Sequence, residues 1–249
     1  MPKRRLSFIV PAFNEQKLIG ITIETIHTIA PKYCKDYEII IIDDCSSDKT
    51  GTVIDKMAIK DKKIVALHNT KNMGMGFSYF KGLDAARFEY VMVVFGDNDH
   101  PAQSIGNIIS KMGHADIIIP YYKNLHISKT WLRHVISITY VHLVNYLTGL
   151  SVPYYNGITM HRTDLIRQVP RTTAGFGFQV ETIAYLAKRG ATCLEVDIIN
   201  EEKKTNASAA FRPGNILSVL GTFFRLAWNY KISPQGNPKF YSKQYPSLK

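Results

Sequence analysis

The sequence is poor in cysteine and has no long apolar segment, and both shortages exclude classes of protein. Its three cysteines, Cys34, Cys45 and Cys193, lie far apart and form no C-x-x-C pair. This spacing predicts neither a zinc knuckle nor a disulfide framework, and it is typical of a reducing compartment. No window of about 18 uncharged apolar residues occurs, so we expect no membrane-spanning helix. The apolar stretch near the N-terminus stops at Pro11, too early for a secretory leader.

Acidic residues are the scarcer charge: 20 Asp and Glu stand against 31 Lys and Arg, a formal net charge of +11. Such an excess suits nucleic acid, an anionic membrane face or phosphate-bearing substrates. No zinc-finger or RNP-type signature accompanies the charge, so nucleic acid is not expected as a partner. Hydrophobic residues make up 45% of the 249 positions, and no Pro/Gly/Ser-rich linker divides them. We therefore expect a single α/β domain over residues 1–249.

Short apolar runs alternate with helical patterns over the first 120 residues. The runs predict strands over 6–10, 38–42, 64–67 and 90–95. The segments between them predict helices over 14–29, from 48 to the vicinity of Ile59, and over 77–86. Strands that alternate with helices of this length indicate βαβ units and a mostly parallel sheet.

The second half has a different character. It predicts strands over 116–120 and 192–198 and helices over 131–150, 179–188 and 215–228. The first and last of these helices are apolar and aromatic, with cations near their ends, and Arg225 interrupts the last one. Both fit ordinary core helices as well as amphipathic helices in a bilayer interface, and we favour the interface.

Polar clusters follow the first, second and fourth predicted strands, at 11–15, 43–48 and 96–101. Ligands of parallel sheets bind at the carboxyl ends of the strands, so the three clusters predict one shared crevice. Asp97 and Asp99 can share a Mg²⁺ or Mn²⁺ ion, which prefers oxygen ligands. Such an ion would neutralise charge that develops on a leaving diphosphate. The alternative is a polar turn, which Asp and Asn also favour.

The remaining polar clusters have two readings each. Asp43 and Asp44 are placed to accept hydrogen bonds from a ribose or a base, but Asp44 or Ser46 could instead cap the next helix. Gly74 and Gly76 would let the backbone approach a ligand closely or adopt positive φ. Neighbouring Lys71 and Lys81 could supply charge to a diphosphate, and the alternative is an ordinary loop.

Taken in order, these segments resemble the motifs of family 2 glycosyltransferases. The resemblance lies in Ser7–Glu15 (SFIVPAFNE), Ile41–Thr50 (IIDDCSSDKT), Asn72–Gly76 (NMGMG) and Gly96–Pro101 (GDNDHP). It covers roughly the first 120 residues and implies a GT-A type fold, a Rossmann-like α/β sheet flanked by helices, which binds a nucleotide sugar. Residues 1–120 would then be the donor-binding half and residues 121–249 the acceptor-binding half.

The resemblance also implies a set of site residues. Asp97 and Asp99 would be catalytic and bind the metal, Mg²⁺ or Mn²⁺. The donor, a GDP- or UDP-hexose, would contact Pro11, Ala12, Asn14, Glu15, Asp43, Asp44, Ser46, Asn72, Gly74, Gly76, Lys81 and Asp97.

The second half resembles the dolichyl-phosphate mannose synthase branch in Asn156–Arg162 (NGITMHR) and Gly177–Glu181 (GFQVE). Two stretches depart from that branch: Phe95 stands where its first aspartate is found, and 202–209 (EKKTNASA) lacks most of its basic motif. The branch implies a polyprenyl phosphate acceptor and an inverting, in-line displacement on the cytoplasmic face of a membrane. The acceptor phosphate would be bound by Arg133, Lys203, Ser208 and Arg212.

Other readings stay open. A soluble or polysaccharide hydroxyl acceptor shares the whole first half and needs a general base, for which Glu181 is the first candidate. A non-catalytic module that binds a nucleotide sugar is another reading, because Phe95 replaces an expected acidic residue. A sugar nucleotidyltransferase needs a Gly-rich basic loop after the first strand, which Pro11–Glu15 is not. A membrane-anchoring partner or a homo-oligomer is compatible with each transferase reading.

Overall fold

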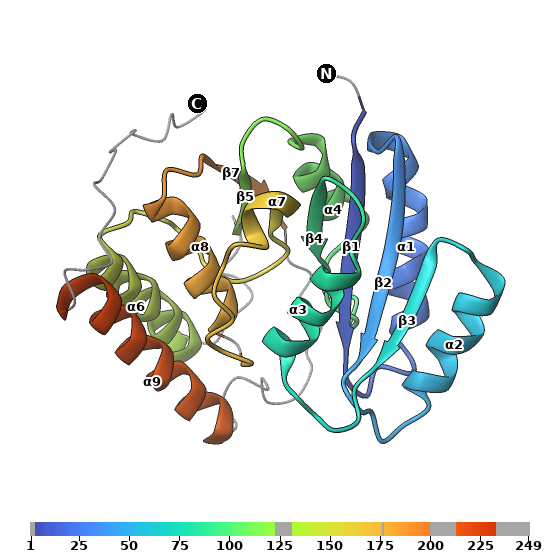
Figure 1. The fold of residues 1–249 in the computed structure, drawn as a ribbon, viewed down its shortest axis with the longest axis horizontal. Helices are drawn as coiled ribbons and strands as arrows, with labels where there is room; N and C mark the ends of the chain where they lie inside the picture. Colours follow the sequence, from blue (N-terminus) through green and yellow to red (C-terminus); the bar gives the residue numbers. More distant parts are fainter. Residues whose placement is uncertain (1–2, 123–130, 176, 200–212, 233–249) are drawn as a thin grey trace.

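The computed structural model describes residues 3–122, 131–175, 177–199 and 213–232, in which a seven-stranded sheet lies between two layers of helices (Figure 1). The strand order is β3-β2-β1-β4-β6-β5-β7. The strands are β1 (Arg5–Ala12), β2 (Asp36–Asp43), β3 (Ile64–His68), β4 (Tyr90–Val93), β5 (Ile117–Tyr122), β6 (Met160–Arg162) and β7 (Cys193–Ile198). All pairs are parallel except those of β6 with β4 and β5. The predicted mostly parallel α/β sheet is confirmed.

The helices cover both faces of this sheet. They are α1 (Ile19–Tyr33), α2 (Thr50–Lys60), α3 (Met75–Ala85), α4 (Ala102–Ser110), α6 (Trp131–Thr148), α7 (Thr163–Ile166), α8 (Phe178–Lys188) and α9 (Pro213–Ala227), and the π-helical turn η2 (Trp228–Ile232) follows α9. Buried side chains of α1, α2 and α4 form one apolar core, and those of α3, α6, α7, α8 and α9 form the other. Sequence reasoning missed β6, α4 and α7.

The central strands are apolar on both faces because helices cover both. In β1, Phe8 and Val10 contribute to the core under α1 and α4, and Ile9 contributes to the opposite core. Fully burying each such side chain contributes about 1.5–3 kcal/mol relative to exposure. The continuous isoleucine run of β2, 39–42, is fully buried for the same reason. These strands therefore hold the loops at their carboxyl ends in a fixed position.

Strand β6 joins the two halves of the chain. His161 lies in register with Val91 of β4 on one side and with Ile117 of β5 on the other. The start of β6 is held by α8, since the Gln179 side chain accepts from the Gly157 N–H (3.1 Å) and donates to the Gly157 carbonyl (2.6 Å). The glycine and the glutamine of the two second-half motifs thus contact each other and dock α8 on the sheet.

Candidate active site

The loops after β1, β2 and β4 lie side by side at one edge of the sheet, as predicted. Strand β1 pairs with β2 on one side and β4 on the other. Beyond the strands, the Asp44 N–H donates to the Ala12 carbonyl (2.9 Å) and the Gly96 N–H to the Pro11 carbonyl (3.3 Å). Pro11 and Ala12 therefore lie between the loop that follows β2 and the loop that follows β4, and they bond to both.

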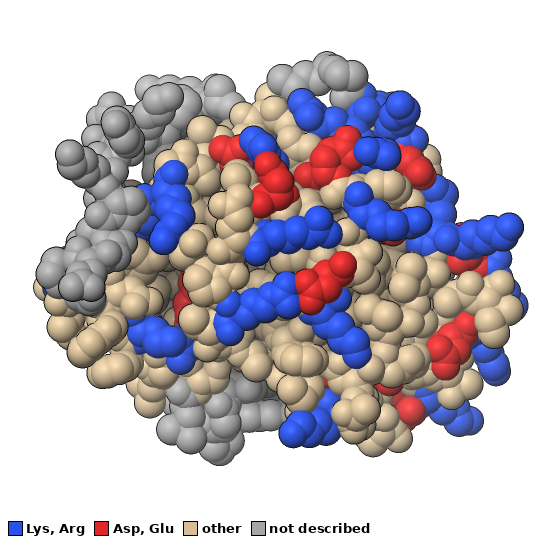
Figure 2. Space-filling model, in the orientation of Figure 1, with Lys and Arg blue, Asp and Glu red and all other residues tan. Residues whose placement is uncertain are grey.

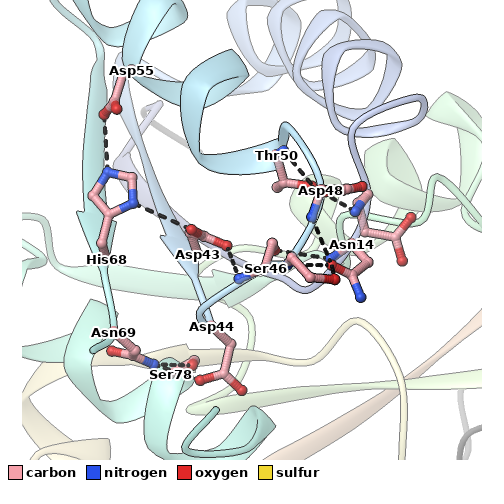
Figure 3. A network of polar contacts seen from close by, with 12 residues as sticks. Asn14, Asp43, Asp44, Ser46, Asp48, Thr50, Asp55, His68, Asn69 and Ser78 are labelled. Atoms are coloured by element: carbon pink, nitrogen blue, oxygen red, sulfur yellow. Dashed lines mark hydrogen bonds and ion pairs between the residues drawn. The ribbon is translucent and has the colours of Figure 1, made fainter. Parts of the chain in front are cut away.

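Asn14 ties the β1–α1 loop to the β2–α2 loop (Figure 3). Its Oδ1 accepts from the Ser47 N–H at 2.8 Å, and its own N–H donates to Ser46 Oγ at 2.9 Å. Asn14 adopts a left-handed φ of 59°, which brings these groups into reach. Asn14 and Ser46 were predicted to contact the sugar donor. In the structure, their polar groups form hydrogen bonds that join the two loops.

The alternative in which Asp44 or Ser46 caps α2 is wrong, because the helix starts at Thr50 and neither side chain bonds to its first turn. Asp48 Oδ1 accepts from the Thr50 N–H at 2.9 Å, whereas Asp44 and Ser46 bond elsewhere. Burial opposes ionisation of Asp48, but the hydrogen bonds from Thr50 outweigh it and hold its pKa below the usual value. The predicted helix over 14–29 also begins later, at Ile19, because the Gln16 N–H donates to Asp48 Oδ2 (3.2 Å) instead of entering a helix.

Asp43 is buried at the end of β2, with 6% of its surface exposed. Its Oδ1 accepts from the Ser46 N–H at 3.0 Å, and its Oδ2 lies 3.3 Å from His68 Nδ1. His68 Nε2 in turn lies 2.9 Å from Asp55 Oδ1 (Figure 3). His68 of β3 therefore links the Asp43 carboxylate at the end of β2 to Asp55 of α2.

Asp44 holds the loop that precedes α3. Its Oδ1 accepts from Asn69 Nδ2 (2.7 Å) and the Met73 N–H (2.8 Å), and its Oδ2 accepts from the Gly74 N–H (2.8 Å). The residue is only 5% exposed. Hydrogen bonds to a charged acceptor are the stronger kind, so Asp44 fixes this loop against the end of β2. Asn72, within the same loop, is exposed.

The glycines of the predicted phosphate loop are approached by the chain itself. Gly74 has φ 91°, and the Gly76 N–H donates to the Ala174 carbonyl at 2.7 Å. A Cβ at Gly76 would lie 2.9 Å from the Thr173 and Gly175 carbonyl oxygens. The predicted positive φ is confirmed at Gly74, and the close contact observed at Gly76 is with the 173–175 segment.

Lys81 also differs from its predicted role. Its Nζ donates to the His68 carbonyl (2.5 Å) and to Asn69 Oδ1 (2.9 Å), and so holds the end of β3. The ammonium that was expected to face a diphosphate thus donates to the His68 carbonyl and the Asn69 side chain.

Glu15, Asp97 and Asp99 bring negative charges together. Burial raises the pKa of Glu15 to about 7, and the charges of Asp97, Asp99 and Asp48 raise it in the same direction. The Asp99 N–H donates to Asp97 Oδ1 at 3.3 Å, and Asn98 between them has a left-handed φ of 54°. This turn directs two carboxylates to the side of Glu15, so their mutual repulsion favours binding of a cation.

The residues fit a cation that completes its coordination with other oxygens. Among the described residues, no group of three or more His, Cys, Asp or Glu is arranged to enclose a metal. Mg²⁺ is usually bound through one or two carboxylates together with substrate phosphates and water, and Asp97 with Asp99 matches that pattern.

Glu181, the first candidate for a general base, forms an ion pair with Arg225. It is on α8, where its Oε1 accepts from Arg225 Nε (2.9 Å) and Nη2 (2.7 Å), and its Oε2 accepts from Thr172 Oγ1. Glu181 therefore links α8 to α9. The sequence signal for this link is Arg225, a lone cation within an apolar helix.

The other predicted residues have separate outcomes. Phe95 is half-buried, packs against the core on the α3 side, and its ring lies 6.0 Å from that of His100. The Arg133 side chain and all of Lys203, Ser208 and Arg212 lie outside the described residues. Their proposed contact with an acceptor phosphate stays a prediction.

Helices α6 and α9 with η2 present apolar side chains to solvent. We call this surface the α6–α9 face. Its exposed side chains include Val135, Ile136, Ile138, Leu143, Tyr146, Leu220, Phe224, Trp228 and Ile232. Phe224 and Trp228 stack with ring centroids 6.3 Å apart and line a hollow with Arg225 and Asn229. No helix in the described ranges is long and apolar enough to cross a bilayer. The expected place of these helices in a bilayer interface stays a prediction.

The positive charge does not gather in one place on the face shown in Figure 2, where lysine and arginine are interleaved with acidic residues. Among the described residues, several arginines pair with a nearby carboxylate, such as Arg171 with Asp84 (2.7 Å) and Arg162 with Asp116 (3.0 Å).

Comparison with known proteins defines the family. The model of "Glycosyl transferase family 2" matches residues 7–168, and the chain belongs to this family. A prophage bactoprenol glucosyl transferase homolog of Escherichia coli K12 is 31% identical over 116 residues, which are 46% of this chain and 38% of that protein. The chain thus spans 38% of the length of this relative.

Two further similarities cover more of the chain. The polyprenol monophosphomannose synthase of Mycolicibacterium smegmatis is 24% identical over 219 residues, 83% of this chain and 81% of that protein. Glucosyl-3-phosphoglycerate synthase of Mycobacterium tuberculosis, solved with Mn²⁺, UDP-glucose and phosphoglyceric acid, superimposes with a TM-score of 0.69 at 15% identity, over 90% of this chain and 80% of that one. The predicted GT-A type fold is confirmed.

Proposed function

We propose that this protein is a metal-dependent, inverting glycosyltransferase that moves a hexose from GDP- or UDP-hexose to a polyprenyl phosphate. The proposal rests on one observation: Glu15, Asp97 and Asp99 gather their charges beside the loops of β1 and β2. A cation and a sugar diphosphate fit this edge of the sheet. Relatives named for polyprenol and undecaprenyl-phosphate mannose transfer support the choice of acceptor.

In this proposal residues 1–120 bind the donor. Pro11, Ala12 and Asp43 line the nucleoside pocket, with Asn14, Ser46 and Asp44 keeping its loops in place. Asp97 and Asp99 hold Mg²⁺ or Mn²⁺, which when bound supplies a Lewis acid that neutralises charge on the departing diphosphate. Glu15 extends the negative field toward the same position.

The displacement needs few further groups. An acceptor phosphate oxygen attacks the anomeric carbon, the bond from that carbon to the diphosphate oxygen breaks, and the nucleoside diphosphate leaves with the electron pair. A phosphate oxygen is already anionic at neutral pH, so no side chain has to remove a proton. The pairing of Glu181 with Arg225 is compatible with this acceptor, because it gives the carboxylate a structural task. Positioning and charge neutralisation then account for catalysis.

Residues 121–249 form the acceptor half in this proposal. The α6–α9 face would lie in the bilayer interface with its apolar side chains inserted, which makes the protein peripheral on the cytoplasmic side of a membrane. Arg133, Lys203, Ser208 and Arg212 would then bind the acceptor phosphate. A membrane-anchoring partner or a second copy of the chain is compatible with the same arrangement.

The test is a screen of GDP- and UDP-hexoses against polyprenyl phosphate in detergent and against soluble sugar acceptors with free hydroxyls, each with Mn²⁺, with Mg²⁺ and with chelator. We expect one donor to give a glycolipid in the presence of metal and none with chelator. If sugar is transferred only to soluble hydroxyl acceptors, the proposed polyprenyl phosphate acceptor is wrong and a hydroxyl acceptor takes its place. Absence of both transfer and donor hydrolysis with every donor would overturn the proposal in favour of a non-catalytic module.

A further inference from the structure

His68 bridges two carboxylates at the end of β3, next to the proposed nucleoside pocket. Its Nδ1 lies 3.3 Å from Asp43 Oδ2, and its Nε2 lies 2.9 Å from Asp55 Oδ1 (Figure 3). Both ring nitrogens can donate at the same time only in the charged imidazolium. His68 is also the register partner of Asp43 in the parallel pair of β2 and β3. The bridge therefore ties α2, through Asp55, to the strand end that carries Asp43.

The charged groups around the imidazole favour its protonated form. Burial lowers the pKa of His68, but the hydrogen bonds with Asp55 and Asp43 outweigh burial, so its pKa lies above the usual value. Asp43 faces the ring from β2 and Asp55 faces it from α2. From α3, the Lys81 ammonium contacts the His68 carbonyl. The imidazole is thus held between two acceptors.

Gly51 leaves the space that this contact needs. It is the second residue of α2, and a Cβ built on it would lie 2.9 Å from Asp43 Oδ2 and 3.5 Å from His68 Nδ1. Glycine is a poor helix former, so a glycine here indicates that a side chain would disturb the neighbouring groups. With Oδ1 held by the Ser46 N–H and Oδ2 by His68, the Asp43 carboxylate is fixed from both sides.

We propose that His68 is a positioning residue of the donor site, which holds the Asp43 carboxylate in the orientation that accepts hydrogen bonds from the nucleoside of the donor. The inference rests on the proposed function, in which Asp43 lines the nucleoside pocket. His68 and Asp55 are the accessible members of the cluster, with side chains 40% and 56% exposed, whereas that of Asp43 is 9% exposed. Asp43 makes the contact with the nucleoside, and His68 acts through it.

The experiment compares nucleotide binding by wild type, His68→Leu and Asp55→Asn, using calorimetry with UDP and GDP in the presence of Mn²⁺. Losing a hydrogen bond to a charged group weakens binding by about tenfold or more, and we expect that loss for His68→Leu. Affinity for pyrophosphate with Mn²⁺ should not change, because in the proposed function Asp97 and Asp99 hold the metal ion that binds the diphosphate, and neither contacts His68. In turnover, the donor KM should rise by the same factor while kcat stays within about twofold.

The chain offers matched controls. Gly20 is the second residue of α1, as Gly51 is of α2, and a Cβ on Gly20 would meet no atom within 4 Å. Gly51→Ala should weaken nucleotide binding, and Gly20→Ala should leave it unchanged although both remove a helical glycine. His114→Ala removes an exposed imidazole far along the chain and should also have no effect.

The outcomes separate the inference from the function on which it rests. If wild type binds a nucleotide and the His68, Asp55 and Gly51 variants bind it equally well, His68 has no positioning role and the proposed function stands. If wild type binds no nucleotide at all, both ideas fail. Thermal unfolding checks each variant, and should His68→Leu not fold, the exposed Asp55→Asn decides the question.

Discussion

The donor edge of the sheet and the α6–α9 face use their side chains in opposite ways. At the donor edge, polar groups of neighbouring loops satisfy one another: Asn14 bonds to Ser47, Asp44 to Gly74, and Asp43 to Ser46. On the α6–α9 face, large apolar side chains such as Phe224 and Tyr146 are 66% and 70% exposed. The first region is organised before any ligand arrives, whereas the second leaves apolar surface that another surface can cover.

The two regions meet at the segment before α8. The Ala174 carbonyl accepts from the Gly76 N–H at the donor edge, and Thr172 bonds to Glu181, which pairs with Arg225 of α9. Side chains of α9, Ser218 and Thr222, also fill the space beside Gly175 and Gly177. A change on the α6–α9 face therefore has a short physical route to the loop before α3.

The largest expected effect lies at the donor edge. We expect Asp97→Ala and Asp99→Ala each to reduce sugar transfer by about 1,000-fold, because the metal and its neutralising charge are lost. Removing either charge also relieves part of its repulsion with Glu15, so the pKa of Glu15 should fall. The measurement is initial rate with saturating Mn²⁺, with Glu24→Ala of α1 as a control for loss of an exposed charge. Retained transfer in both variants would sink the metal assignment.

Asp44→Ala tests whether the donor edge is organised in advance. The change leaves Asn69 Nδ2 and the N–H groups of Met73 and Gly74 without their acceptor. We expect the free energy of unfolding to fall by about 3 kcal/mol, because buried donors lose charge-assisted bonds. Denaturant unfolding measures this loss. An unchanged midpoint would mean that the loop before α3 is held by other contacts.

Arg225→Met tests the link between the two regions. It leaves the Glu181 carboxylate, whose side chain is 11% exposed, without its cation. Because Arg225 itself is one third exposed, we expect a loss of about 2 kcal/mol, below that of a fully buried pair. The double variant Arg225→Met with Glu181→Gln should recover much of the lost stability. A loss in the double variant equal to the sum of the two single losses would argue against a coupled pair.

The buried His161 side chain of β6 should make the free energy of unfolding depend on pH. Burial lowers its pKa to about 3, and neither ring nitrogen has a hydrogen-bond partner among the described residues. The unfolded chain binds a proton below about pH 6.5 and the folded one does not, so stability falls as the pH drops. We expect about 2 kcal/mol less stability at pH 5 than at pH 7 from this group, and a smaller slope in His161→Leu. Equal slopes in both proteins would remove His161 as the cause.

The smallest effect concerns the α6–α9 face. We expect the pair Phe224→Ser and Trp228→Ser to weaken sedimentation with anionic vesicles by about tenfold, since less apolar area enters the interface. The matched control is Ile59→Ser on α2, which removes an apolar side chain that is 84% exposed but lies outside this face. If the control weakens vesicle binding as much as the pair does, the effect comes from loss of exposed apolar area in general and not from a membrane-facing surface.

Sequence reasoning was strongest where one local signal decides the structure. The apolar runs before Pro11 and Asp43 predicted buried strands, and the polar clusters that follow predicted a common edge. It was weaker where a short element depends on distant partners. The three-residue strand β6 has no periodicity of its own and exists because β4 and β5 pair with it. The late start of α1 likewise depends on Asp48, a residue of another loop.

By itself, the sequence determined the parallel α/β sheet, the family and the position of the acidic loops, because alternating apolar patterns and motif order are local properties of the chain. Only the tertiary structure decided what each polar group contacts. In the folded protein the Gly76 N–H donates to the Ala174 carbonyl, Lys81 donates to the His68 carbonyl, and Glu181 pairs with Arg225. The physical reason is that a hydrogen bond or an ion pair needs two partners within about 3 Å, and folding brings together partners that lie far apart in sequence.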